Sequence, residues 1–243
     1  MKELLLATNV TTSFVLMIPL SAMIALLIAK KIKFRDLITG IGYSLLIRLV
    51  FNLVSNALYQ YHLFNEIMNS ILFILLSTGL MLFAFKKYER IMNDHSSLSF
   101  GLGFGFIEEA IIIGFPVLYT RIFLSFAMKG NIYEYYPELT KAEVDALVNQ
   151  YTSIPARDYF ISALLGILII LFYLQIFTLY KQAKNSNNPK EVLLALTAVC
   201  LVQIIYQTFS VTGYLMGTIL LAAIDVALFI YGSKKDYLRK GIE

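Results

Sequence analysis

Two adjacent carboxylates stand in the middle of an apolar stretch of this sequence. Residues 99–114 read SFGLGFGFIEEAIIIG, and Glu108 and Glu109 lie near the centre of a run long enough to cross a membrane. A charged side chain at that depth costs about 2.5–3.5 kcal/mol on insertion scales, so acids there are rare and mark candidate functional sites. We therefore treat Glu108 and Glu109 as candidate catalytic residues.

A second polar pattern precedes them. Four polar side chains follow one another at intervals of four residues: Ser44, Arg48, Asn52 and Asn56. This spacing places all four on one face of a helix, and such a face is expected to turn toward other helices or a water-filled cavity rather than toward lipid. We expect Arg48, Asn52 and Asn56 to line a polar cavity near the glutamates.

Further polar groups come from the last third of the chain. Gln203 and Gln207 share a helix face with Cys200 and Ser210, and Asp225 lies within the final apolar run. We include Gln203 and Gln207 among the candidate catalytic residues and Asp225 among the residues of the cavity. One glutamate is expected to pair with Arg48 or to be neutral. The group serves either as an ion-pair network that fixes helix registry or as a functional acid.

The glycines before the acids have a packing role of their own. Gly101 and Gly105 form a GxxxG pair, and the same spacing continues to Glu109. Small residues at this interval allow another helix backbone to come close. The pattern predicts a tightly packed partner helix beside the acids.

The amino-acid composition indicates that these residues lie within a membrane. Of the 243 residues 58% are hydrophobic and only 15% charged, against about 25% charged in soluble domains. We predict an all-α, polytopic membrane protein that forms a single integral membrane domain over residues 1–243. Seven membrane-spanning helices are expected near 11–29, 37–59, 67–85, 98–120, 159–180, 191–210 and 213–232.

The distribution of basic residues predicts an orientation. Most of the 20 Lys and Arg residues fall in the connections 30–35, 86–97 and 181–190 and in the tail after 232. These segments alternate with the spans, so the positive-inside rule places the N-terminus outside and the C-terminus inside. The basic pI of about 9.0 is then a consequence of topology, and we expect no nucleic-acid partner.

One connection is long enough to hold structure. Residues 129–158 form an external loop in which Thr140 and Glu143 have capping-box spacing and open a short amphipathic helix through about 150. Its apolar side would carry Val144, Leu147 and Val148. The segment is either a surface helix that ties two spans together or a lid over a cavity.

The residues of this chain speak against several kinds of catalytic or cofactor site. The chain has only two histidines, His62 and His95, both in expected connections on opposite sides of the membrane. This count speaks against a zinc centre and against a Ser/His pair at depth, so we expect no metal and no cofactor. Gly101, Gly103 and Gly105 lie within an expected membrane helix, which is not the context of a dinucleotide-binding fingerprint.

The segment GLGFGFIEEAIIIG resembles the glutamate helix of the YhfC-type membrane peptidases, relatives of the CAAX-processing and bacteriocin-processing (CPBP) glutamic intramembrane proteases. The similarity continues in AKKIKFRDLITGIGYSLLIRLVF and in SIPARDYFISALLGILIILFYL. The resemblance implies that Glu108 acts as the general base on a water with Glu109 as its neighbour. Gln203 or Gln207 would orient the scissile carbonyl, and Arg48 would set the charge of the glutamates.

Positions at which the resemblance implies histidine hold other residues here, namely Phe104, Leu165 and Cys200. The resemblance also implies an EExxxR pattern, but its arginine is missing here, and Gly114 lies near the position where it would stand. Three functions therefore remain open: an intramembrane glutamic-type peptidase, a non-catalytic scaffold, binding or immunity protein of the same fold, and a small proton-coupled transporter. The expected partners are the lipid bilayer and a membrane-embedded peptide or protein, in the plasma membrane of a prokaryote.

Overall fold

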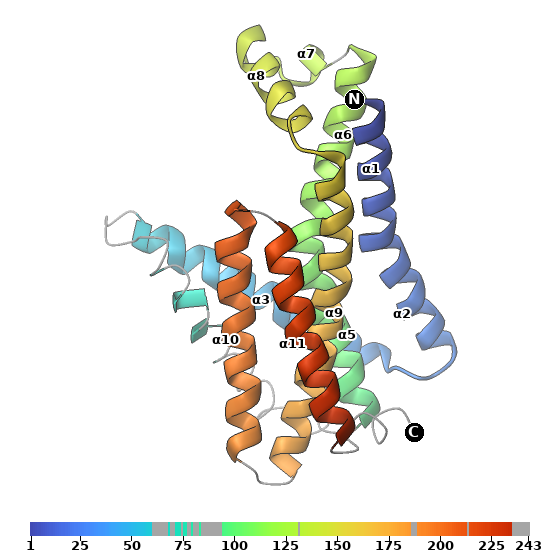
Figure 1. The fold of residues 1–243 in the computed structure, drawn as a ribbon, viewed down its shortest axis with the longest axis vertical. Coiled ribbons are helices and arrows are strands. Elements are labelled where there is room, and N and C mark those ends of the chain that lie inside the picture. The colour runs from blue at the N-terminus through green and yellow to red at the C-terminus, as the bar shows by residue number, and fades with distance from the viewer. Residues whose placement is uncertain are drawn as a thin grey trace.

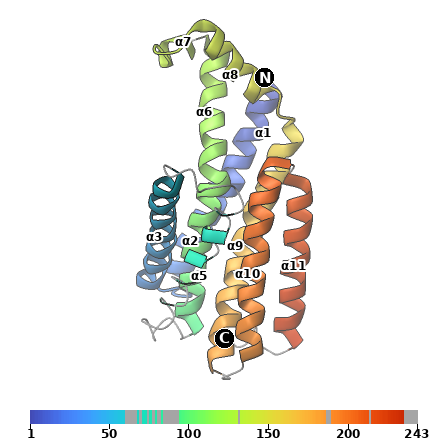
Figure 2. The ribbon, with the colours of Figure 1, turned by 90° about the vertical axis from the view of Figure 1, so that its left-hand side faces the viewer.

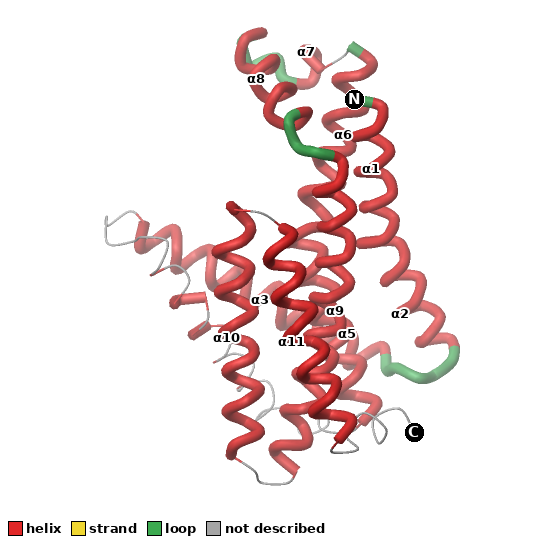
Figure 3. The backbone as a smooth tube through the Cα atoms, viewed as in Figure 1, coloured by secondary structure: helices red, strands yellow, loops and turns green. Residues whose placement is uncertain are grey.

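The computed structural model describes residues 1–59, 94–130, 132–185, 189–212 and 214–234, with isolated helical positions at 68, 71–73, 75–76, 79 and 83. Every regular element in these ranges is a helix, and none of the described residues forms a strand (Figure 3). The prediction of an all-α fold is confirmed for this part of the chain. Most of the predicted third span, 67–85, lies outside it.

Two long, continuous helical segments, called rods below, each contain a π-helical turn. The first consists of α1 (Lys2–Thr12), η1 (Ser13–Met17) and α2 (Ile18–Ile28). The second consists of α5 (Asp94–Glu109), η3 (Ala110–Gly114) and α6 (Phe115–Lys129). A proline follows each π turn, at Pro19 and Pro116. Proline is tolerated at the first position of a helical segment, where its missing N–H is least costly.

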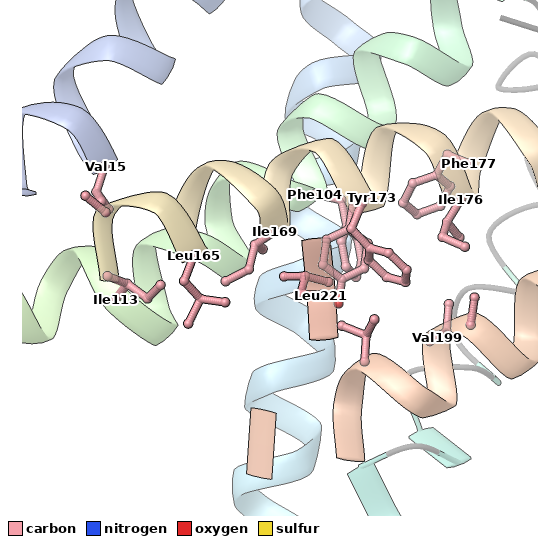
Figure 4. Packing of buried hydrophobic residues seen from close by; sticks show 14 of the residues in the cluster. Val15, Phe104, Ile113, Leu165, Ile169, Tyr173, Ile176, Phe177, Val199 and Leu221 are labelled. Carbon is pink, nitrogen blue, oxygen red and sulfur yellow. The ribbon is translucent and has the colours of Figure 1, made fainter. Parts of the chain in front are cut away.

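The remaining long helices are α3 (Phe34–Tyr59), α9 (Ala156–Asn185), α10 (Pro189–Thr212) and α11 (Tyr214–Lys234). Helix α9 lies at the centre, in contact with α1, α5, α10 and α11 (Figure 1). Its Ile169, Tyr173 and Phe177 are buried, and Figure 4 shows them between side chains of the neighbouring helices. Helix α3 packs against α5 and projects away from the bundle along its length (Figures 1 and 2).

Five helical segments in the described ranges are long and apolar enough to cross a membrane: Lys2–Ile28, Phe34–Leu58, Ser96–Lys129, Ala156–Lys181 and Leu215–Ser233. They correspond to the first, second, fourth, fifth and seventh predicted spans, although the first begins nine residues earlier and the fourth ends nine residues later. Helix α10 covers the predicted sixth span but is not among the five. The architecture is thus a membrane-type helical bundle, and the number of seven spans stays a prediction.

The outer surface and the two ends fit this class. Large apolar side chains are exposed along the long helical segments, among them Leu6, Met17, Leu53 and Phe229. The N-terminus lies at the same end as α7 (Ile132–Tyr135) and α8 (Lys141–Thr152), whereas the basic connection after α2 lies at the opposite end (Figures 1 and 2). The C-terminal ends of α9 and α11 also lie at this opposite end (Figure 1). The side of the membrane that each end faces stays a prediction.

Helix α8 begins with the capping box that the sequence predicts. The Glu143 N–H donates to Thr140 Oγ1 at 3.4 Å, and the Thr140 N–H and hydroxyl donate to Glu143 Oε2 at 2.7 and 2.8 Å. These bonds from the Thr140 backbone and hydroxyl hold the pKa of Glu143 below its usual value. Val144 is buried with Phe123 of α6 and Ile132 of α7, so the apolar side of α8 packs within the chain.

Candidate functional site

Glu108 forms an ion pair with Arg48. Its carboxylate accepts hydrogen bonds from Ser44 Oγ at 2.8 Å and from Arg48 Nε at 3.3 Å, both at Oε1, and Arg48 Nη2 donates to Oε2. The Glu108 side chain is 1% exposed and that of Arg48 is 21% exposed. Of the two alternatives expected for the glutamates, a pair with Arg48 or a neutral acid, the structure has the pair, and Glu108 is its acid. Both of its oxygens are occupied by donors from α3.

Reciprocal glycine contacts bring α3 to this distance. A Cβ atom added at Gly40 would lie 2.1 Å from the carbonyl oxygen of Phe100, and one added at Gly103 would lie 2.2 Å from that of Leu37. The two backbones therefore touch, which only glycine permits. Ser44 follows Gly40 by one turn, and Glu108 follows Gly103 by five residues, so the contact places the donors opposite the acceptor.

An aromatic side chain covers the other side of the arginine. The guanidinium carbon of Arg48 lies 4.4 Å from the centroid of the Phe73 ring, which in turn packs edge-on against Phe51 at 4.9 Å. Phe73 is itself buried. Cation–π contact of this kind suits a guanidinium whose fork is bound to a carboxylate. The Arg48 guanidinium therefore contacts the Glu108 carboxylate on one side and the Phe73 ring on the other.

Glu109 points in a different direction and has no such partner. Its Oε1 lies 3.1 Å, and its Cγ 3.2 Å, from the position of a Cβ added at Gly166 of α9, and Val15 Cγ2 of η1 lies 3.2 Å from the same position. The side chain is fully buried, and neither carboxylate oxygen has a hydrogen-bond partner among the described residues. Adjacent helical residues point about 100° apart, so the two glutamates serve different interfaces.

The predicted GxxxG packing is confirmed on this second face. Positions for an added Cβ at Gly101 and Gly105 lie 3.2–3.4 Å from atoms of Tyr173, Phe177 and Ile170 of α9. Residues 101, 105 and 109 thus face α9 together. The sequence did not indicate that Gly103 would serve α3 in the same way, or that Gly166 would stand opposite Glu109.

Among the described residues, no hydrogen bond joins the other predicted cavity residues to Glu108. Asn52 and Asn56 are exposed on α3, and their place in a polar cavity near the glutamates stays a prediction. Helix α3 projects away from the bundle along its length (Figure 1). Asp225 is buried on α11 with Leu221 and Leu228, and neither of its carboxylate oxygens has a hydrogen-bond partner in the described ranges.

The two glutamines fall on α10, but their side chains lie outside the described part of the structure. Their convergence on the glutamates stays a prediction. No group of three His, Cys, Asp or Glu residues that could hold a metal occurs among the described residues. Cys200 is a free, half-buried thiol.

Two positions at which the resemblance implies histidine are part of the apolar core. Phe104 is buried with its ring 4.8 Å from that of Tyr173 and 5.4 Å from that of Phe177. Leu165 is buried on α9 in the same hydrophobic cluster (Figure 4). These positions contribute packing and cannot contribute a proton donor or acceptor.

The chain matches no family model, no curated protein and no solved structure. Membership of the YhfC-type peptidases therefore stays a prediction that rests on the three sequence segments quoted above.

Proposed function

We propose that this chain is a non-catalytic membrane protein that binds a membrane-embedded peptide or protein. One observation carries the proposal: the carboxylate of Glu108 accepts hydrogen bonds from Ser44 and Arg48 at both oxygens. These three bonds engage three of the about four lone-pair sites of the carboxylate, which leaves a single site for the proton of an attacking water. A carboxylate held by a guanidinium and a hydroxyl serves instead to fix the position of α3 on α5.

The filled histidine positions support the same conclusion. General acid–base help contributes about 10²–10⁴-fold to a hydrolytic rate. Phe104 and Leu165 offer no such help, because their side chains are apolar and packed in the core. In this proposal the bundle lies in the plasma membrane of a prokaryote with its basic connections inside, and it acts as a scaffold, binding or immunity protein.

A peptide screen tests the proposal. The purified chain in lipid nanodiscs is incubated with a set of synthetic single-span peptides, and mass spectrometry measures retained and cleaved peptide. We expect intact retention of some peptides and no product that depends on Glu108. A product that appears with the wild type and is lost in Glu108→Gln, with the fold intact by size-exclusion chromatography, would contradict the proposal. So would failure to retain any peptide.

The carboxylate of Glu109 has no hydrogen-bond partner among the described residues, which favours a second candidate, a peptidase in which Glu109 is the base. The same screen with Glu109→Gln distinguishes it, since cleavage would then depend on Glu109 and persist in Glu108→Gln. Asp225→Asn is the matched control, because it removes another buried, unpartnered acid from a different helix.

A further inference from the structure

Glu109 lies where three helical elements meet, and no described residue there donates a hydrogen bond to it. It ends α5 and faces Gly166 of α9, and Val15 of η1 lies next to the same glycine. A buried anion without a donor is costly, by several kcal/mol in a medium of low dielectric constant. A positive charge at the carboxylate would remove that cost. Among the described residues no such charge is bonded to Glu109, which points to a small neutralising partner.

Each of the two π turns leaves one main-chain oxygen without a helical donor. The N–H of Ile18 donates to Ser13 O, and that of Phe115 donates to Ala110 O, each one residue further back than in an α-helix. Pro19 and Pro116 follow and have no N–H. The carbonyl oxygens of Phe14 and Ile111 are consequently without a helical donor.

The two turns that contain these oxygens pack against each other. An added Cβ at Gly114 would lie 2.5 Å from Leu16 Cδ2 and 3.4 Å from Val15 Cγ1. Val15 and Glu109 both lie next to Gly166 of α9. Released carbonyls of interrupted helices coordinate small cations in membrane transporters, and π turns are frequent at functional sites.

A row of hydroxyls leads from the N-terminal end toward this junction. Thr8, Thr11 and Thr12 are buried on α1. Their hydroxyls donate to the carbonyl oxygens of Leu5, Tyr159 and Thr8 at 3.0, 2.7 and 2.7 Å. Each hydroxyl oxygen keeps lone pairs that can accept from a hydrated proton or contact a cation. Val15 lies one turn beyond Thr11.

We propose that Glu109 binds a small monovalent cation, a proton or Na⁺, that reaches it from the N-terminal end of the bundle along Thr8, Thr11 and Thr12. The shared chemistry is one positive charge at the buried carboxylate, with the released carbonyl oxygens as additional ligands when the cation is Na⁺. This site is distinct from the Arg48–Glu108 pair that carries the proposed function, because Glu109 faces α9 whereas that pair faces α3. It shares Glu109 with the second candidate function, in which the same carboxylate is the base.

Other ionisable groups lie on the elements around Glu109. Glu108 and Arg48 are bonded to each other on the α3 side. The helices packed around Glu109 carry, in addition, Lys2, Glu3, Asp94, His95, Tyr119, Arg121, Lys129, Arg157, Asp158, Tyr159, Tyr173, Tyr180, Lys181 and Lys184. In the part of the chain that the structure describes, neither oxygen of Glu109 has a hydrogen-bond partner, so the proposal assigns its neutralisation to a mobile cation.

Infrared spectroscopy of the full chain in nanodiscs tests the proposal. We expect a carboxylic-acid C=O band that is lost in Glu109→Gln and retained in Asp225→Asn. In choline chloride the band should disappear as pH rises if the occupant is a proton. If the occupant is Na⁺, NaCl in place of choline chloride at fixed pH should remove the band. Glu109→Asp, which shifts the band, assigns it if Glu109→Gln does not fold.

Two matched threonine variants test the proposed path of the cation along α1. Thr12→Val and Thr39→Val each remove a hydroxyl that donates to the carbonyl four residues earlier, but Thr39 is exposed on α3. We expect hydrogen–deuterium exchange of the acid band to slow in Thr12→Val and not in Thr39→Val. Any one of three results would overturn the proposal. The acid band could respond to neither pH nor Na⁺, it could be unchanged in both Glu109→Gln and Glu109→Asp, or its exchange rate could be equal in the two threonine variants.

Discussion

Replacing Arg48 by methionine is expected to lower the free energy of unfolding by about 3 kcal/mol, because the variant leaves the Glu108 carboxylate buried without its cation. Ser44 alone remains as a donor to that carboxylate. Equilibrium unfolding of the chain in mixed micelles measures the change. Methionine keeps the length of the apolar stem, so lost packing contributes little.

Two comparisons complete this prediction. Asn52→Met introduces the same side chain one turn further along α3 at an exposed position, and we expect it to change stability by less than about 0.5 kcal/mol. The double variant Arg48→Met with Glu108→Met should recover most of the loss, because an apolar pair of similar volume replaces a buried ion pair at little cost. Equal stability of Arg48→Met and Asn52→Met would show that Glu108 does not need Arg48.

The second large effect is expected at the glycine contacts. Gly40→Ala and Gly103→Ala should each destabilise the bundle by about 2 kcal/mol, because each new Cβ meets a carbonyl oxygen of the neighbouring backbone and the two helices must separate. Gly42→Ala is the control on the same helix, since nothing lies within 4 Å of its added Cβ.

Alanine has a higher helix propensity than glycine, so Gly42→Ala should be neutral or stabilising by up to about 1 kcal/mol. The same unfolding experiment compares the three variants. If Gly40→Ala behaves as Gly42→Ala does, the close approach of α3 to α5 is wrong, and with it the geometry that places Arg48 on Glu108.

Local patterns were sufficient to predict the helical elements and part of the site. Apolar runs of membrane length locate α3, α5, α9 and α11, and the GxxxG spacing predicts the packing of α5 on another helix. The cost of unpaired charge in hydrocarbon is enough to predict that one glutamate pairs with Arg48 or is neutral. These inferences depend on residues that are close in sequence or on energies too large to ignore.

The choice between Glu108 and Glu109 could not be made in that way. The two side chains differ by about 100° around the helix, and the rotation of α5 is set by Gly40 and Gly103, which meet only in the folded chain. The exposure of Asn52 depends likewise on the projection of α3 away from the bundle. Pro19 and Pro116 were the local signals of the interrupted rods, but a single extra residue in a helical turn leaves no periodic pattern.

The claim that Glu108 is an ionised carboxylate held by Arg48 can be measured directly by solid-state NMR. Proteoliposomes of the chain with ¹³C-labelled glutamate and ¹⁵N-labelled arginine report the distance between the Glu108 carboxyl carbon and the Arg48 guanidinium nitrogens. We predict the chemical shift of an ionised carboxylate and a distance that fits a direct hydrogen-bonded contact, both lost in Arg48→Met. A protonated Glu108, or a carboxyl carbon without coupling to Arg48, would contradict the account.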